Sequence, residues 1–240
     1  SQTKITSDIT LYAKWTEISE NPDISDSWEN PFKDVSTDDW FYENVKYAYE
    51  NKIFNGVTDT EFAPNSPLTR AMLVTVLYRV EGEPDNQKDS GFDDVSKDSY
   101  YSKAVAWAKE NGIVNGITET EFAPDANISR EQIAAIIYRY AKFKNQSPTG
   151  AWAIKLDYAD FADISDWAAE AVMYCKLEGI MQGDENNEFK PKDDATRAQA
   201  AAIIQRFLEC VEAEKQSTVN DYNRAKDNLN FREVIFNEQM

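Results

Sequence analysis

Histidine is absent from all 240 residues of the chain. Without an imidazole, the chain has no Ser-His-Asp or Cys-His catalytic machinery and no His-ligated zinc or iron site. Only two cysteines occur, Cys175 and Cys210, too few for a Cys₄ zinc site or for the disulfide framework of a small secreted domain. Composition therefore excludes most nucleophile and metal chemistry, and we expect no cofactor and no metal.

Basic residues and long apolar runs are also scarce. Lys and Arg number 25 against 43 Asp and Glu, a net charge of −18, which is the wrong sign for the counterion release that drives nucleic-acid binding. Apolar runs such as residues 133–138 are far shorter than the ~20 residues of a membrane-spanning helix. We expect no nucleic-acid partner and no membrane insertion. Because the chain begins at Ser1 without a signal sequence, we interpret it as a soluble, monomeric fragment of a longer protein.

What the chain does have is an internal repeat. Phe-Lys-Asp-Val-Ser at residues 32–36 recurs as Phe-Asp-Asp-Val-Ser at 92–96, a spacing of 60 residues. A third copy, aligned on Phe-Ala-Asp-Ile-Ser at 161–165, starts 69 residues after position 92 but ends with Arg197 only 67 residues after Arg130. This alignment predicts that two residues are missing just before Trp167. The predicted boundaries are 1–30 for a strand remnant and linker, 31–81, 92–143 and 160–209 for the copies, and 210–240 for a tail.

Each copy has the pattern of a helix, a loop and a second helix. Apolar residues at helical spacing follow an aromatic residue, and the motif Gly-x5-Phe-x-Pro then interrupts the helix. Thr69, Ser129 and Thr196 are predicted N-caps of the second helices, and Gln132 and Gln199 complete capping boxes where copy one has Met72. Since two helices cannot bury their apolar stripes alone, we expect a mainly α protein in which three copies share one core around an approximate threefold axis.

Five motifs occur in the same order in all three copies, over residues 31 to about 209. They are Phe-x-Asp-Val/Ile, a following aromatic, Asn-Gly or Gln-Gly, Phe-x-Pro, and Thr/Ser-Arg at the second helix. Together they resemble the S-layer homology repeat, which usually occurs in three copies. The resemblance implies a three-pronged spindle around a central three-helix bundle, with grooves between the prongs. It also implies non-catalytic anchoring outside a bacterial cell, in the cell wall or S-layer, by binding pyruvylated secondary cell-wall polysaccharide. Residues 10–16 are similar to the closing strand of a Listeria-Bacteroides surface repeat.

The chain departs from this family at the start of the second helix, where Thr-Arg-Ala-Glu is usual. Residues 69–72 read Thr-Arg-Ala-Met, residues 129–132 Ser-Arg-Glu-Gln, and residues 196–199 Thr-Arg-Ala-Gln. Because the glutamate is lost, and copy one lacks even a polar replacement, we expect the three grooves to be unequal.

Arginine directly after the N-cap is the main candidate for ligand binding. The free N–H groups and dipole of a helix N-terminus favour an anion, and a guanidinium adds a bidentate fork that suits the carboxylate of a pyruvate ketal. Alternatively, each arginine pairs with a nearby aspartate and ties the repeat together. The predicted ligand-binding residues are Arg70, Arg130, Arg197, Asp34, Asp94, Asp163, Trp40, Tyr100, Trp167, Gly56, Gly116, Gly183, Gln132 and Gln199.

Several of these residues have a second interpretation. The three aromatics offer flat faces to a sugar ring but would equally suit core packing. The three glycines let a ligand approach the backbone, yet a left-handed turn explains them as well. A second recurring set, Arg79, Arg139 and Arg206, fits favourable pairing with the helix C-terminal dipole, and Cys175 fits a small buried hydrophobe.

Two other functions stay open at this point, a protein-protein scaffold and an enzyme or calcium module. No acidic pair stands apart from the repeat as a glycosidase needs, and the acidic loops lack EF-hand spacing, so we predict no enzyme activity. The net charge of −18 opposes an anionic polymer, but a Debye length of about 8 Å lets grooves with several arginines act locally.

Overall fold

The computed structural model describes residues 28–85, 88–149, 152–213 and 215–216. The predicted N-terminal strand, with the stretch at 10–16, and the tail beyond residue 216 lie outside these residues.

The described residues are mainly helical, as predicted, and contain isolated β-bridges but no β-strand. Each copy contributes a first and a second helix. The first helices are α1 (Tyr42–Glu50), α3 (Ser102–Glu110) and α5 (Asp166–Leu177), with a 3₁₀ turn η1 (Phe161–Asp163) before α5. The second helices are α2 (Arg70–Val80), α4 (Arg130–Phe143) and the helix at residues 197–213.

The second helices begin at the predicted N-caps. Thr69 Oγ1 accepts a hydrogen bond from the N–H of Met72 (3.2 Å). Ser129 and Gln132 bond reciprocally at 3.3 and 3.4 Å, and the residue pair at 196 and 199 does so at 3.2 and 3.3 Å. The two predicted capping boxes are confirmed, and copy one has only half of one.

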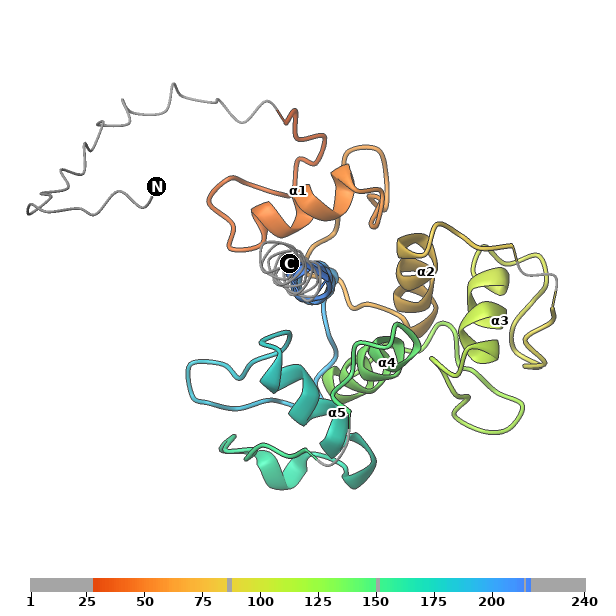
Figure 1. Ribbon diagram of the computed structural model, residues 1–240. Helices are drawn as coiled ribbons and strands as arrows, with labels where there is room; N and C mark the ends of the chain where they lie inside the picture. The colour runs from red at the N-terminus through yellow and green to blue at the C-terminus, as the bar shows by residue number, and fades with distance from the viewer. Residues whose placement is uncertain (1–27, 86–87, 150–151, 214, 217–240) are drawn as a thin grey trace, which may run out of the picture.

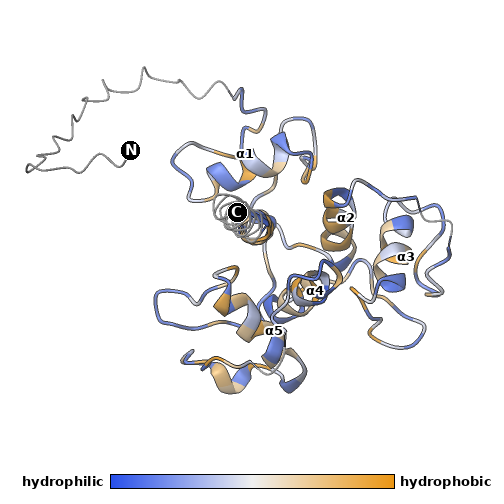
Figure 2. Cartoon of the chain, viewed as in Figure 1, coloured by the Kyte–Doolittle hydropathy of each residue, from blue (hydrophilic) through white to orange (hydrophobic). Residues whose placement is uncertain are grey.

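The apolar stripes of the second helices form the centre of a single core that includes residues of all three copies. Leu77, Ile137 and Ile204 are almost completely buried there. In Figure 1, α2, α4 and the blue helix at 197–213 lie at the centre, with α1, α3 and α5 around them. Figure 2 shows α2 as largely apolar and the peripheral loops as largely hydrophilic. The predicted shared core is confirmed.

Each first helix packs on the second helix of the preceding copy. α3 lies against α2, and α5 lies against α4. The 197–213 helix contacts α1 in the same way, through a hydrogen bond from Asn44 Nδ2 to Gln205 Oε1 (2.9 Å). The copies therefore interlock, and no copy forms a separate packing unit.

Backbone hydrogen bonds close the three copies into a ring just before the second helices. The N–H of Leu68 donates to the carbonyl of Ala195 (2.8 Å), that of Ala195 to Ile128 (3.0 Å), and that of Ile128 to Leu68 (2.9 Å). Each copy thus bonds to its neighbours in the same register. Threefold symmetry of the whole spindle stays a prediction.

The start of the third copy corrects the sequence alignment. Asp34 accepts hydrogen bonds from the N–H groups of residues 62 and 63 (2.8 and 2.7 Å), and Asp94 does the same for residues 122 and 123 (2.9 and 2.6 Å). In copy three Asp160, and not Asp163, receives the equivalent bonds from residues 189 and 190 (2.7 and 2.6 Å). The third copy therefore starts at Tyr158, which packs against Phe189 in a tilted arrangement, as Phe92 does against Phe122.

The predicted deletion before Trp167 is consequently wrong. Tyr158 follows Phe92 by 66 residues, while Arg197 follows Arg130 by 67, so copy three carries one extra residue instead. Residues 161–165 have the residue types of the motif, but they form η1 and the turn that leads into α5.

Candidate functional site

The three arginines after the N-caps join each copy to the next one. Arg70 donates from Nε to the carbonyl of residue 122 (2.9 Å) and from Nη2 to that of residue 115 (3.2 Å). In the same way, Arg130 donates to the carbonyls of residues 189 and 182 (2.7 and 3.0 Å), and Arg197 donates to those of residues 62 and 55 (2.8 Å each). The alternative, in which each arginine pairs with Asp34, Asp94 or Asp163, is wrong for the described residues, because the arginines donate to carbonyls of the next copy and so tie neighbouring copies together.

The same guanidiniums stack on the phenylalanine of the loop that they bridge. The Cζ atoms of Arg70, Arg130 and Arg197 lie 4.8, 5.0 and 4.7 Å from the ring centroids of residues 122, 189 and 62. Burial lowers the pKa of all three, and the nearby Asp94, Asp160 and Asp34 act in the opposite direction. The aspartates therefore support the arginines through space as well as holding the loop.

A groove that we call site A lies where all three copies meet. It has a volume of about 430 Å³. Copy one supplies its first arginine, copy two the loop and helix α4, and copy three the aromatic residue at the rim. The residues that define site A are Arg70, Asn115, Gly116, Gln132, Arg139 and Trp167.

Site B repeats this arrangement one copy further along the chain. It consists of two adjoining hollows of about 220 and 720 Å³ that share Trp40, Arg130 and Gln182. Copy two supplies the arginine, copy three the loop and the 197–213 helix, and copy one the aromatic. The residues that define site B are Arg130, Gln182, Gly183, Gln199, Arg206 and Trp40.

Site C is the third position in the ring, defined in register by Arg197, Asn55, Gly56, Met72, Arg79 and Tyr100. Arg197 reaches Asn55 by a hydrogen bond. Burial first of all raises the pKa of the Tyr100 phenol, and the positive charges of Arg79 and Arg197 lower it. The aromatic of copy two thus lies within electrostatic reach of both arginines, and its counterparts Trp167 and Trp40 line the same grooves as two arginines each.

The three aromatics are solvent-exposed, so the core-packing interpretation is wrong. Trp40, Tyr100 and Trp167 are 64%, 66% and 56% exposed. An indole that stands at the rim of a groove presents an apolar face with little conformational entropy to lose, which suits stacking on a sugar ring.

The second set of arginines was missed as a candidate. Arg139 lines site A and Arg206 lines site B, so each groove holds two guanidiniums. Burial lowers the pKa of Arg139, and Arg139 in turn lowers that of Arg70. The signal was available in the sequence, because these arginines recur nine residues after the first set in every copy.

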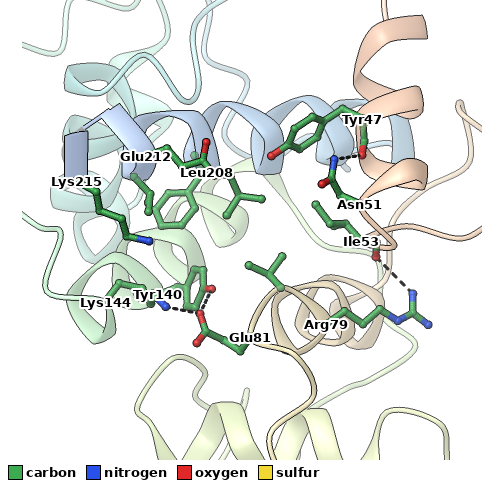
Figure 3. A pocket seen from close by; sticks show the side chains of 13 residues that line it. Tyr47, Asn51, Ile53, Arg79, Glu81, Tyr140, Lys144, Leu208, Glu212 and Lys215 are labelled. Atoms are coloured by element: carbon green, nitrogen blue, oxygen red, sulfur yellow. Dashed lines mark hydrogen bonds and ion pairs between the residues drawn. The ribbon is translucent and has the colours of Figure 1, made fainter. Parts of the chain in front are cut away.

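Arg79 differs from its two counterparts. Its Nη1 donates to the carbonyl of Ile53 (3.5 Å), as Figure 3 shows, and its Nε lies 3.9 Å from a carboxylate oxygen of Glu83. Arg79 also borders a separate pocket of about 280 Å³ at the far end of the bundle, where Glu81 binds Lys144 and Tyr140. Copy one therefore holds its second arginine with contacts inside the protein.

The recurring glycines make room for their own loop. A Cβ atom on Gly56 or Gly116 would lie 2.2 Å from the carbonyl oxygen two residues ahead, and one on Gly183 would lie 3.1 Å from the Tyr158 ring. None of the three has a positive φ, so the left-handed turn is wrong for them. Because they are small, the loop can fold tightly at these positions. The carbonyl of the residue directly before each glycine then accepts a hydrogen bond from an arginine.

Glu131 explains one departure from the usual motif. This buried carboxylate accepts hydrogen bonds from the N–H and Oγ of Ser165 (3.0 and 3.1 Å) and from Lys192 Nζ (2.5 Å). Glu131 thereby joins copy two to copy three. The residues at the same position in the other copies are Ala71 and Ala198. Cys175 is completely buried, as expected, and burial raises the pKa of its thiol.

The described residues hold neither a metal-ligand cluster nor a helix fit to span a membrane. Across residues 28–85, 88–149 and 152–216, apart from position 214, no three His, Cys, Asp or Glu side chains gather as metal ligands would. Within the same part of the chain, every helix is too short or too polar to cross a membrane.

A family model described as the S-layer homology domain matches residues 31–71, 91–134 and 157–201. The third match begins next to Tyr158, in agreement with the corrected alignment. The chain belongs to the S-layer homology family. Proteins of this family lie at the bacterial cell surface, so the expected extracellular location and the general role in surface attachment are confirmed.

The chain is similar to segments of much longer proteins. It is 35% identical over 191 residues to an Endoglucanase of Bacillus sp. (strain KSM-635), a match that covers 79% of this chain and 20% of that protein. It is 33% identical over 186 residues to an Amylopullulanase of Thermoanaerobacterium thermosulfurigenes, covering 76% and 10%. It is 29% identical over 211 residues to the Surface-layer 125 kDa protein of Lysinibacillus sphaericus, a match that covers 81% of this chain and 16% of that protein. The chain thus spans a fifth or less of each of these relatives.

Proposed function

We propose that this S-layer homology module is a non-catalytic anchor that binds an anionic, pyruvylated cell-wall polysaccharide in the grooves between its copies. The observation that carries the proposal is the composition of sites A and B. Each combines two arginines, at least one glutamine and an exposed tryptophan from three different copies.

These side chains match the parts of an acidic sugar. The second arginine of each site, Arg139 or Arg206, can form the bidentate bonds that a carboxylate prefers, because among the described residues it makes no hydrogen bond of its own. The glutamine amide can bond sugar hydroxyls, and the indole can cover an apolar ring face. The first arginine, Arg70 buried in site A and Arg130 partly buried in site B, adds positive charge to the floor of each groove.

The relatives support a binding role over a catalytic one. The same segment occurs in proteins named for two different carbohydrate reactions and in a surface-layer protein. A segment shared by proteins with such different names suits a common attachment step, and the chemistry then belongs to the parts of those relatives that this chain does not cover.

Several sites on one module also suit a repeating polymer. When two sites engage neighbouring units of one strand, the second contact forms at high effective concentration, and avidity exceeds the affinity of either site. This offsets the weak binding expected of a shallow groove on a protein of net charge −18.

Sedimentation with purified cell walls tests the proposal. The chain should sediment with walls that retain their secondary polysaccharide, and it should stay in the supernatant once the polysaccharide has been removed chemically. Unchanged sedimentation after that removal would instead favour binding to a wall protein and the alternative of a helical-repeat scaffold.

A further inference from the structure

Sites A and B have matching arginines and aromatics but different rims. The residues that line site A include Arg70 and Arg139 and no carboxylate, and the exposed Ile117 lies on its edge. The residues that line site B include one more cation, Lys190, and a set of carboxylates at Asp184, Glu185, Glu188, Asp193 and Asp194.

Some of these carboxylates are occupied within the protein. Asp184 accepts hydrogen bonds from the N–H groups of residues 186 and 188 (2.9 Å each) and pairs with Lys190 (2.7 Å). The hydrogen bond from Lys190 and these N–H groups lower the pKa of Asp184 to about 2. Asp194 accepts a bond from Asn127 Nδ2 (2.7 Å).

Two carboxylates in site B remain available to a ligand. The side chains of Glu185 and Asp193 are exposed, and neither makes a hydrogen bond or ion pair with any of the described residues. The corresponding positions in the site A loop are Thr118 and Ala126. These two side chains therefore distinguish the sites without taking part in the side-chain contacts that hold the copies together.

The charges that act on Arg70 and Arg130 differ accordingly. Burial lowers the pKa of both Arg70 and Arg130. The next influence on Arg70 is the positive charge of Arg139, which lowers its pKa further, and Asp94 raises it, whereas Tyr158, Asp193, Asp160 and Asp184 all raise the pKa of Arg130. The lining of site A therefore carries positive charge and no carboxylate, and the lining of site B carries both signs of charge.

We propose that site B selects a saccharide unit bearing both a carboxylate and a protonated amine, while site A prefers a purely anionic unit. In site B the carboxylate meets Arg206 and Arg130, and the ammonium group faces Glu185 and Asp193. In site A an ammonium group would meet two arginines, the amides of Asn115 and Gln132 and an apolar rim, but no carboxylate. The inference rests on the proposed function, since it assigns ligand classes to the same two grooves.

A matched pair of sugars tests this inference directly. Muramic acid and N-acetylmuramic acid carry the same carboxylate and differ in whether the amine is free or acetylated. At pH 6 the free amine is protonated. NMR titrations would use two variants, Trp167→Ala with Tyr100→Ala to leave site B, and Trp40→Ala with Tyr100→Ala to leave site A.

We expect site B to bind muramic acid about three- to tenfold more tightly than N-acetylmuramic acid, and site A to show the reverse order. Replacing Glu185→Thr and Asp193→Ala together, which copies the site A loop, should abolish the preference of site B. The control is Glu119→Thr, which removes an exposed carboxylate from the equivalent loop of copy two, outside the lining of site A.

The outcomes separate the inference from the proposed function. Equal affinity of site B for the two sugars, or a preference that survives the double substitution, would overturn the inference alone. If site A binds neither sugar, the proposed carboxylate recognition is itself contradicted. All the substituted side chains are exposed, so circular dichroism should show a folded protein in every case.

Discussion

Sites A and C are built to one plan but differ in what they leave free for a ligand. In site A, Gln132 closes a capping box and Arg139 lines an open groove. In site C the same positions hold Met72 and Arg79, and Arg79 is bonded to Ile53 and lies near Glu83. Copy one has therefore kept the residues that join the copies, but Met72 replaces the polar glutamine, and Arg79 is held by contacts inside the protein.

The two arginine sets show that recurrence alone does not separate scaffold residues from ligand residues. The first arginines and the Asp of the motif recur without change and make contacts inside the protein. The second arginines also recur, yet Arg139 and Arg206 line open grooves without a hydrogen bond to the described residues. Ligand recognition is therefore expected to depend on these two arginines and on the exposed side chains of the aromatic and the loop.

The largest effect should follow from removing a shared scaffold residue. Arg197→Ala deletes two charge-assisted hydrogen bonds and leaves the carbonyls of residues 62 and 55 without that donor. We expect the free energy of unfolding to fall by about 3 kcal/mol in urea denaturation. Arg206→Ala, an exposed arginine on the same helix, is the matched control and should change stability by less than about 1 kcal/mol. Equal losses in the two variants would refute the division between scaffold and ligand residues.

The aromatic residues should separate the sites by affinity. Trp167→Ala and Trp40→Ala should each weaken polysaccharide binding about tenfold, because each removes an exposed ring from an open groove. Tyr100→Ala should weaken binding less than threefold, since in site C Met72 replaces the glutamine and Arg79 is held by contacts inside the protein. Isothermal titration of the three folded variants measures this order. A dominant effect of Tyr100 would reverse our ranking of sites A and C.

Copy three carries a buried polar group that the other copies lack. The hydroxyl of Tyr158 is buried and has no hydrogen-bond partner among the described residues, and the equivalent residues are Phe32 and Phe92. Burial raises the pKa of this phenol to about 12. Tyr158→Phe should therefore raise the free energy of unfolding by about 1 kcal/mol. A clear loss of stability would show that the hydroxyl is satisfied in the native protein.

Copy one also differs at the end of its first helix. Lys52 adopts a φ of +57° where the other copies have Gly112 at +68° and Gly179 at +67°. A side chain is disfavoured in this left-handed region, so Lys52→Gly should stabilise the protein by about 0.5 to 1 kcal/mol. The reverse change, Gly112→Lys, should cost a similar amount. Thermal unfolding of the pair checks both signs, and changes of the same sign would contradict this reasoning.

The smallest effect concerns the helix start of site C. Met72→Gln should complete the capping box of α2 and raise stability by a few tenths of a kcal/mol. The new amide should also bring the affinity of site C closer to that of site A. A titration in the Trp40→Ala and Trp167→Ala background would detect the gain, and an unchanged affinity would place the defect of site C at Arg79 alone.

Much of the fold could be predicted because the same pattern of residues occurs three times in the sequence. Helix starts, capping boxes and apolar stripes recur at fixed offsets, and each depends on local chemistry that a sequence displays. The interlocking of each first helix with the preceding second helix could not be predicted, because it depends on loop paths and on packing between copies. The same holds for the ring of hydrogen bonds at residues 68, 128 and 195.

The error at Asp163 has a physical lesson. Residues 161–165 match the motif in residue identity better than residues 158–162 do. The structural role of the motif, however, is to pack an aromatic ring against Phe189 and to accept a hydrogen bond from its N–H group with a carboxylate. Tyr158 and Asp160 satisfy both requirements. A tyrosine for phenylalanine change concealed this equivalence, as it would from any comparison based on residue identity alone.

The central claim is that Arg139 and Arg206 hold the carboxylate of the wall polysaccharide, and one titration tests it most directly. The double variant Arg139→Ala/Arg206→Ala is compared with the unmodified chain by isothermal titration with pyruvylated polysaccharide fragments, after thermal unfolding has shown that both proteins are folded. We predict a loss of affinity of at least about tenfold, with the melting temperature nearly unchanged. Unaltered affinity in the folded double variant would contradict the claim.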